Sequence, residues 1–303
     1  MNKQELTNLV AEILSQMNDP QPQVKSSEYK TVVYHDDRPE EPPKPGEFVE
    51  DISALDLRKL YMVDRPADEK AFRRLKEKTP ARLGSGRAGP RYKTLTMLRF
   101  RADHAAAQDA VFSELPEDFG EKNGLVSVKT RCKDKDEYLT RPDFGRGFDE
   151  ENAKKIKAAI SNAPRVQLVI GDGLSSAAIA ANAMDCAAAI RDGLKVRGIE
   201  LGQGIYVKYC RVGAGDAVGD ITECELVCVL VGERPGLVTD KSMSAYITYK
   251  PHTGVSESAR TVVSNIHAQG TPAVEAGAYV AELIETILKR KVSGVGLHME
   301  AAQ

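Results

Sequence analysis

The sequence predicts an α/β fold, in which a Rossmann-like, largely parallel sheet with flanking helices is preceded by a helical N-terminal region and a mobile linker. An apolar run at residues 226–231 is typical of a strand that is buried on both faces of a parallel sheet, and a further strand is expected at residues 166–170. An alanine-rich helix is expected between them. Strands and helices that alternate in this way indicate βαβ units.

The first 19 residues are expected to form a short amphipathic helix. Six apolar side chains recur at helical spacing, with polar ones on the other side: Leu6, Leu9, Val10, Ile13, Leu14 and Met17. Residues 20–49, rich in proline and charge, cannot bury a core and are predicted to be a disordered linker. So short a helix needs a surface for its apolar stripe, on its own domain or on another protein, and the long linker favours another protein.

Residues 50–149 are predicted to be a mostly helical, polar region with a long helix at 94–113. Before this helix comes a glycine-rich loop at 83–90. Its glycines stand in a GxGxxG-like order, at Gly84, Gly86 and Gly89. No apolar strand leads into the loop, so the dinucleotide-binding fingerprint fails its context test. With Arg87 the loop is equally well interpreted as an anion site or as an ordinary loop.

Residues 150–303 are predicted to hold the alternating strands and helices. The expected elements are helices at 150–161, 176–194, 216–221 and 272–291 and strands at 166–170, 205–212, 226–231 and 245–249. Four polar loops are expected to share the carboxyl edge of the sheet, at 171–176, 211–215, 232–236 and 260–267. Ligands of open α/β sheets bind beyond this edge, so we expect a sizeable, nucleotide-like cofactor there.

The segment Gly232-Glu-Arg-Pro-Gly236 follows a predicted buried strand at this edge. Glycine lets a backbone approach a ligand closely, and proline stiffens the turn. Glu233 could act as a base if it were desolvated. The neighbouring Arg234 instead favours a charged carboxylate that accepts hydrogen bonds from a ligand. Taken alone, the segment fits a surface turn with a solvated ion pair equally well.

Composition and motifs argue against several classes of function. A net charge of −2 over 303 residues gives no electrostatic footprint for nucleic acid, and no apolar stretch suits a membrane span or a secretory signal. The five cysteines lack metal-ligand spacing, which indicates no metal site and a reduced, cytoplasmic compartment.

Catalytic residues are also hard to find. The sequence has no GxSxG elbow and no P-loop string. His104, beside Asp103 on a predicted helix, is expected to form a local hydrogen bond rather than to act as a base, and His267 has no identifiable partner acid. Taken by itself, the chain is interpreted as a cofactor-binding subunit with an incomplete set of catalytic residues.

Several motifs are spread in order along the chain after residue 50. They are Gly86-Arg-Ala-Gly-Pro90, Leu98-Arg-Phe100 with Ala102-Asp-His104, Tyr138-Leu-Thr-Arg-Pro-Asp143, Asp172-Gly-Leu-Ser175, Leu230-Val-Gly-Glu-Arg-Pro-Gly-Leu237, and Ser264-Asn-Ile-His267 with Gly270-Thr-Pro272. Through them the sequence resembles the small (light) subunit of ethanolamine ammonia-lyase, the adenosylcobalamin-dependent enzyme of bacterial ethanolamine catabolism. The segment at 20–49 does not match in detail, as expected of a linker.

This resemblance implies that the chain pairs with a large barrel subunit in a trimer of (αβ)2 units. Adenosylcobalamin would lie between the two subunits with its lower face on the small one, and the substrate pocket would belong to the large one. Homolysis of the cobalt–carbon bond would start a radical reaction that converts ethanolamine to acetaldehyde and ammonia. The chain lacks an Asp-x-His-x-x-Gly string, so the dimethylbenzimidazole base of the cofactor is expected to stay on cobalt.

Carried over residue by residue, the cofactor contacts of the family fall at Val212, Glu233 and Val262. Some members of the family carry cysteine at the last position, so a valine there implies contact through the backbone or by packing. The resemblance also implies that residues 150–303 form the cobalamin-binding domain, and that residues 50–149 pack on the partner.

The helix at 1–19 resembles peptides that deliver enzymes of this pathway into a bacterial microcompartment in the cytoplasm. It is therefore expected to bind a shell protein. Two hypotheses of other classes stay open: a self-sufficient α/β enzyme with a nucleotide cofactor, and a pure assembly module.

Overall fold

The computed structural model describes residues 51–299, apart from 53–54, 57–58, 80 and 161. These residues belong to one compact unit. The helix expected at 1–19 and the linker expected at 20–49 lie outside the described residues.

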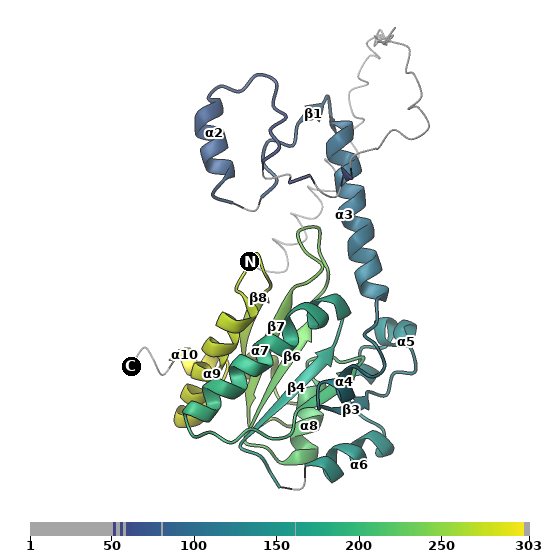
Figure 1. The fold of residues 1–303 in the computed structure, drawn as a ribbon, viewed down its shortest axis with the longest axis vertical. Coiled ribbons are helices and arrows are strands. Elements are labelled where there is room, and N and C mark those ends of the chain that lie inside the picture. Colours follow the sequence, from purple (N-terminus) through teal and green to yellow (C-terminus); the bar gives the residue numbers. More distant parts are fainter. Residues whose placement is uncertain (1–50, 53–54, 57–58, 80, 161, 300–303) are drawn as a thin grey trace, which may run out of the picture. The chain divides into compact units, whose positions relative to one another are not determined.

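The centre of the fold is a six-stranded sheet in the order β3-β5-β4-β6-β7-β8 (Figure 1). In chain order its strands are β3 (Val126–Lys129), β4 (Val166–Asp172), β5 (Ile205–Lys208), β6 (Leu226–Gly232), β7 (Met243–Tyr249) and β8 (Arg260–Ile266). The first four strands in the spatial order run parallel, and β7 is antiparallel to both β6 and β8. Because β8 therefore runs in the direction of β6, its carboxyl end lies at the same edge as those of the four parallel strands, which we call the carboxyl edge.

The two predicted central strands are confirmed. Every residue of β4 and of β6 is buried, as expected of neighbouring parallel strands that are covered on both faces. Their register runs from Val166 opposite Leu226 to Gly171 opposite Val231. The glycine-rich turn after β4 and the polar turn after β6 are consequently brought side by side at the carboxyl edge.

Helices cover both faces of the sheet (Figure 1). On one face α7 (Ser176–Val196) and α9 (Ala273–Arg290) pack against each other, and on the other face lie α6 (Glu150–Ala159) and α8 (Ala214–Thr222). Gly277 permits the close approach of α7 and α9, because a Cβ atom there would lie 2.5 Å from the carbonyl oxygen of Cys186. Ser175 caps α7 by accepting a hydrogen bond from the amide of Ala178 at 3.0 Å.

The remaining elements are short, except for one long helix. They are α2 (Glu69–Lys76), β1 (Arg87–Ala88), β2 (Arg91–Tyr92), α3 (Thr94–Phe112), α4 (Phe119–Lys122), α5 (Lys135–Thr140), η2 (Phe144–Arg146), η3 (Glu257–Ala259) and α10 (Val295–Met299). The glycine-rich loop at 83–90 contains the first strand of the two-stranded antiparallel hairpin β1–β2. At the turn of this hairpin Gly89 has φ +62°, a conformation that favours glycine.

Three features of the sheet differ from the sequence-based expectation. Strand β3 lies before residue 150, so the sheet extends N-terminal to its expected start. The strand expected at 205–212 ends at Lys208, because Tyr209 adopts a left-handed conformation with φ 59°. The segment at 260–267 is not a loop but forms strand β8, of which only the end lies at the carboxyl edge.

A buried ion pair joins β8 to α8. The guanidinium of Arg260 binds the carboxylate of Asp216 through two contacts, Nη1 to Oδ1 at 2.7 Å and Nη2 to Oδ2 at 2.8 Å. The two side chains are only 3% and 8% exposed. Asp216 also lies in the first turn of α8, where a negative charge is favourable.

The five cysteines are all buried, and none forms a disulfide bond. Cys186, Cys210 and Cys228 are fully buried within the two main core clusters. Burial raises the pKa of the Cys186 thiol to about 12, so this thiol stays protonated and acts as a small apolar side chain.

Candidate functional site

A cleft of about 660 Å³ opens at the carboxyl edge beside β6, β7 and β8. We call it the edge cleft. Its lining comes from the loop after β6, from β7 and from the end of β8, and comprises Glu233, Arg234, Gly236, Leu237, Val238, Thr239, Ser242, Ser244, Tyr246, Ser264, Asn265, His267, Gln269 and Gly270.

The alternation of side chains along a strand explains this lining. Residues that lie directly opposite each other on paired strands point to the same face. Tyr246 lies opposite Val229 on β6 and Val262 on β8, and Val229 belongs to the core beneath α6 and α8. Arg260, at the start of β8, is covered by α8, whereas Val262 two residues later is 47% exposed. The cleft therefore lies on the α8 side of the sheet, where the last strands emerge from their helical cover.

Glu233 is held in place at the mouth of this cleft. Its backbone amide donates to the carbonyl of Ser242 at 2.9 Å, and its Oε1 accepts a hydrogen bond from the hydroxyl of Tyr246 at 2.7 Å. Burial, and then the bond to this carboxylate, raise the pKa of Tyr246. Tyr246 therefore remains a protonated donor, and Glu233 is positioned as a hydrogen-bond acceptor.

Ser244 is the most unusual residue of the lining. Its side chain is 1% exposed, yet its hydroxyl forms no hydrogen bond within the described part of the chain. A buried polar group without a partner costs about 1–3 kcal/mol. A hydroxyl that lines a cleft and lacks a protein partner is a candidate for binding a ligand.

The three residues expected to contact a cofactor fall on the same side of the sheet. Glu233 lines the edge cleft, and Val262 is the exposed neighbour of Tyr246 on β8. Val212 lies in the turn between β5 and α8, half-buried against the core beneath α6 and α8. Neither valine lines the cleft itself.

The two histidines considered as bases lie apart. His267 lines the edge cleft, and its Nδ1 accepts a bond from the amide of Gln269 at 3.3 Å. His104 lies on α3, and its imidazole forms no hydrogen bond with a described residue, so the expected local bond is absent. Its neighbour Asp103 pairs instead with Arg82 at 2.7 Å and Arg99 at 3.0 Å.

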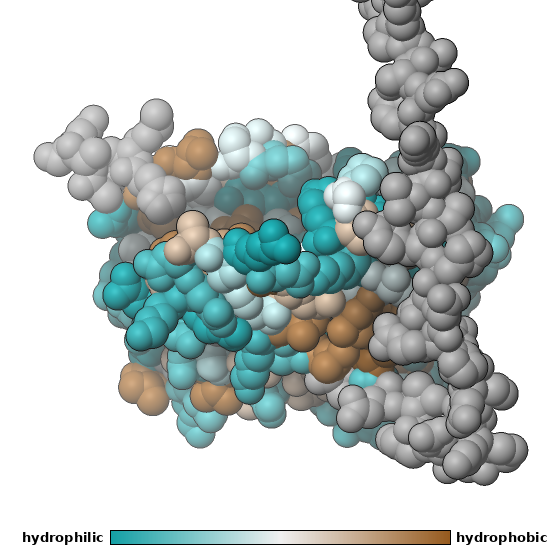
Figure 2. Space-filling view, turned by 90° about the horizontal axis from the view of Figure 1, so that it is seen from above, coloured by the Kyte–Doolittle hydropathy of each residue, from teal (hydrophilic) through white to brown (hydrophobic). Residues whose placement is uncertain are grey.

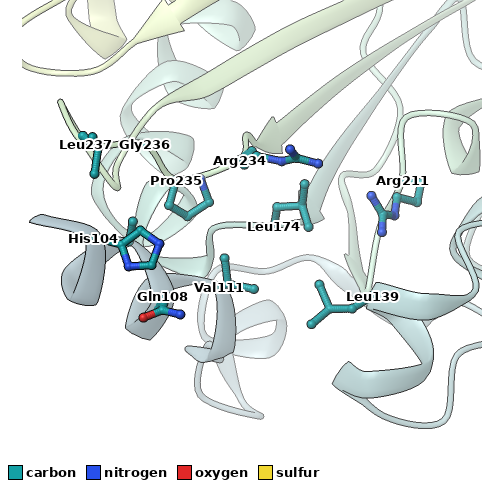
Figure 3. Close-up of a pocket in the computed structure, with 11 residues that line it drawn as sticks. His104, Gln108, Val111, Leu139, Leu174, Arg211, Arg234, Pro235, Gly236 and Leu237 are labelled. Carbon is teal, nitrogen blue, oxygen red and sulfur yellow. The ribbon is translucent and has the colours of Figure 1, made fainter. Parts of the chain in front are cut away.

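A second cavity, of about 370 Å³, lies between α3 and the turns that follow β4, β5 and β6 (Figure 3). We call it the arginine cavity, because Arg211 and Arg234 both line it. The sequence placed both arginines in loops at the carboxyl edge. It gave no sign that they would share a cavity with a helix more than a hundred residues earlier in the chain.

A buried polar network lies at the end of β4, next to the carboxyl edge. Asp172, at the end of β4, accepts hydrogen bonds from Ser176 Oγ at 2.6 Å and from the hydroxyl of Tyr206 at 3.2 Å. Lys135 donates to the carbonyl of Gly173 at 3.3 Å. Burial raises the pKa of Asp172 and lowers that of Lys135. These bonds fix the turn after β4 against its neighbours.

The fold and this edge define a class of protein: an α/β protein with a polar cleft at the carboxyl ends of its strands. In the described part of the chain, no group of histidine, cysteine and acidic side chains is suited to hold a metal ion. None of the described helices is long and apolar enough to cross a membrane.

Comparison with known proteins identifies the family. A family model described as ethanolamine ammonia-lyase light chain matches residues 69–298. The chain is 54% identical to the ethanolamine ammonia-lyase small subunit of Clostridium perfringens, over 98% of this chain and 100% of that protein. It is 58% identical to that of Clostridioides difficile, over 82% and 85% of the two chains. It is 50% identical to that of Listeria monocytogenes serovar 1/2a, over 98% and 100%. The chain therefore belongs to the family of ethanolamine ammonia-lyase small (light) subunits, which confirms the resemblance found in the sequence.

Proposed function

We propose that this chain holds one face of adenosylcobalamin in an ethanolamine ammonia-lyase, which converts ethanolamine to acetaldehyde and ammonia. The observation that carries the proposal is the edge cleft, in which the buried hydroxyl of Ser244 has no partner among the described residues. Adenosylcobalamin supplies radical chemistry when it is bound. The small subunit contributes binding and orientation.

The lining of the cleft fits a corrinoid. A corrin ring is a broad, largely apolar plate with amide side chains around its rim. The amides require hydrogen-bond donors and acceptors, which Ser244, Glu233 and Asn265 offer. The exposed side chain of Val262 offers an apolar contact beside them. Because the cleft is open on one side, a ligand seated there would keep its other face free for a partner.

Glu233 has a defined task in this proposal. Its Oε1 is occupied by the hydroxyl of Tyr246. The second carboxylate oxygen accepts no bond from a described residue and is left to accept an N–H group from a ligand amide. Val212 and Val262 act by packing or through their backbone groups. All three residues are proposed cofactor contacts, and no residue of this chain is proposed to act on the substrate.

The partner in this proposal is the large subunit of the enzyme, in a trimer of (αβ)2 units. Leu237 and Val238, in the lining of the edge cleft, are 44% and 63% exposed, and Phe112 on α3 is 61% exposed. Figure 2 shows a group of hydrophobic residues among hydrophilic ones on the face that is seen from above. Exposed apolar groups of this kind are typical of surfaces that another protein covers.

The N-terminal segment has a separate proposed role. Residues 1–19 would bind a shell protein and bring the enzyme into a bacterial microcompartment within the cytoplasm. Deletion of residues 1–19 is expected to leave turnover of ethanolamine intact and to abolish localisation in the compartment. Loss of turnover on deletion would contradict this role.

The two other hypotheses predict different results. A self-sufficient nucleotide enzyme would turn over a substrate without the large subunit. The hairpin β1–β2 at the glycine-rich loop speaks against it, because no strand of the main sheet leads into that loop. A pure assembly module would bind no corrinoid, and substitution of Glu233 would then leave corrinoid affinity unchanged.

The test is co-expression with the large subunit, followed by titration with adenosylcobalamin in the presence of ethanolamine. The complex is expected to bind the corrinoid and to release ammonia, and a complex without activity would contradict the proposal. Glu233→Gln should weaken corrinoid binding about tenfold or more, because it removes a charged hydrogen-bond acceptor.

The chain offers a matched control for Glu233. Glu225 precedes β6 and accepts a bond from the hydroxyl of Tyr249 at 3.4 Å, at the opposite end of β6 and β7. Glu225→Gln therefore changes a similar tyrosine–glutamate pair far from the cleft, and corrinoid affinity is expected to stay within twofold of the wild-type value.

A further inference from the structure

Two arginines face each other in the arginine cavity. Arg211 follows β5 and Arg234 follows β6 at the carboxyl edge. Figure 3 shows both side chains extending into the cavity from opposite sides, with Leu174 below Arg234 in this view. Two like charges that approach each other repel, unless an anion lies between them.

The contacts of the two arginines leave hydrogen-bond donors unused. Arg211 is fixed by Tyr138: its Nη2 donates to the carbonyl of Tyr138 at 2.9 Å, and its guanidinium lies 4.3 Å from the centre of the Tyr138 ring. The buried Nε of Arg211 has no hydrogen-bond partner among the described residues. Arg234 forms neither a hydrogen bond nor an ion pair with any of them. The buried Nε of Arg211 and the exposed guanidinium of Arg234 therefore keep donors that no described residue satisfies.

No carboxylate of the described residues forms an ion pair with either arginine. Asp172 accepts bonds from Ser176 and Tyr206, and Glu114 accepts bonds from Lys208 and Tyr209. Neither of these acids forms an ion pair with Arg211 or Arg234. By contrast, Arg260 and Arg82 each meet a described carboxylate.

The walls of the cavity strengthen its preference for an anion. They include the apolar side chains of Val111, Leu139, Leu174 and Pro235. Charges interact more strongly beside apolar walls than in open water, because the local dielectric constant is lower. Guanidinium groups also bind phosphate oxygens through paired N–H donors, which gives the interaction direction as well as strength.

We propose that Arg211 and Arg234 form an anion site that binds the phosphodiester in the nucleotide tail of cobalamin. This inference rests on the proposed function and extends it to a part of the cofactor other than the corrin ring. Each arginine directly neighbours a proposed corrinoid contact, Val212 or Glu233. The phosphodiester is the anionic group of the cobalamin tail, so the charge of the ligand matches that of the cavity.

The experiment compares three corrinoids that differ in the tail. Cyanocobalamin carries the phosphodiester and the base, cyanocobinamide phosphate carries a phosphate without the base, and cyanocobinamide carries neither. The dissociation constant of each is measured from the visible absorbance change, on the complex co-purified with the large subunit. The wild-type complex is compared with Arg234→Gln and Arg211→Lys. Arg197→Gln is the control, since Arg197 bonds Glu285 on α9 at 2.9 Å, away from both cavities.

Arg234→Gln is expected to weaken binding of cyanocobalamin and of cyanocobinamide phosphate about tenfold, and to leave cyanocobinamide within twofold of wild type. Arg211→Lys, which keeps the charge but loses the paired donors, should show a smaller loss in the same pattern. Arg197→Gln should bind all three as the wild type does.

Three results would overturn the inference. The first is an equal loss of affinity of Arg234→Gln for all three corrinoids, and the second is no loss of affinity for any of them. The third is failure of Arg234→Gln to co-purify with the large subunit, which would assign the cavity to a partner carboxylate. A wild-type complex that binds none of the three corrinoids would contradict the proposed function itself, so the two failures are distinguishable.

Discussion

The hydroxyl of Tyr246 lies 2.7 Å from Oε1 of Glu233, so a side chain of β7 holds the carboxylate of the loop that follows β6. The bond joins an element of the sheet to a loop at its edge. It leaves Glu233 with a fixed direction before any ligand arrives, and pre-organisation of this kind lowers the entropic cost of binding.

Tyr246→Phe should therefore weaken corrinoid binding about fivefold, which corresponds to the loss of a hydrogen bond worth about 1 kcal/mol. The measurement is a corrinoid titration of the complex with the large subunit. Tyr249→Phe, which removes the hydroxyl at the other end of β7, should bind as the wild type does. Equal affinities for the wild type and Tyr246→Phe would show that Tyr246 does not orient the acceptor.

Ser244→Ala should separate binding from stability. Its buried hydroxyl has no partner in the described chain, so its removal is expected to leave the free energy of unfolding without corrinoid unchanged or to raise it by about 1 kcal/mol. Corrinoid affinity should fall several-fold. Ser176→Ala is the control, because that buried hydroxyl is bonded to Asp172 and its loss should destabilise the chain by about 1–2 kcal/mol. Destabilisation by Ser244→Ala without loss of affinity would contradict a ligand-binding role.

Asp216→Asn should be strongly destabilising. It removes the buried counter-charge of Arg260 and leaves this guanidinium only the exposed carboxylate of Glu257, which lies 2.7 Å from its Nε. The loss of one partner of a buried pair costs about 3–5 kcal/mol. Urea unfolding of the chain measures this loss. Asp143→Asn breaks the pair between Asp143 and Arg141, whose side chains are 56% and 53% exposed, and should cost far less stability, because solvent screens an exposed pair. Similar losses in the two variants would contradict the structural role of the buried pair.

Glu114→Gln should change how stability depends on pH. Hydrogen bonds from Tyr209 and Lys208 lower the pKa of Glu114 below its ordinary value of 4.5. The stabilisation from the ionised carboxylate is thus fully present above that value and is lost as the pH falls through the lower, folded-state pKa. Glu114→Gln should be less stable than wild type at pH 7, and the difference should shrink in acid below pH 4.5. A difference that is constant between pH 7 and pH 3 would exclude this linkage.

The central strand β6 was predictable because it is a continuous apolar run from Leu226 to Val231. Strand β3 was missed because Val126-Ser-Val-Lys129 is short, alternates in polarity and is only partly buried at the edge of the sheet. The early end of β5 could not be foreseen either. Nothing in an alternating stretch indicates that Tyr209 adopts φ 59°, since that conformation depends on tertiary contacts.

The position of the candidate site was predictable from the sequence, but the contacts between its side chains were not. The polar segment around Glu233 marked the carboxyl edge, because ligand loops follow buried parallel strands. The hydrogen-bond partner of Glu233 is Tyr246, which lies in the middle of β7. The sequence of this strand carries no motif that indicates a functional residue. The unsatisfied hydroxyl of Ser244 and the facing arginines arise from contacts between distant segments. Such contacts leave no local pattern in a sequence.

The order of strands in the sheet also bears on how the chain is made. Within the described sheet β3 pairs only with β5, and Ile205 comes 76 positions after Lys129. At a synthesis rate of about 5–20 residues per second, β3 leaves the ribosome about 4–15 s before its neighbour exists. β6, β7 and β8, in contrast, pair in the order in which they are made. We therefore expect β6, β7 and β8, which carry the edge cleft, to pair soon after they are synthesised. β3 can enter the sheet only after β5 has been translated.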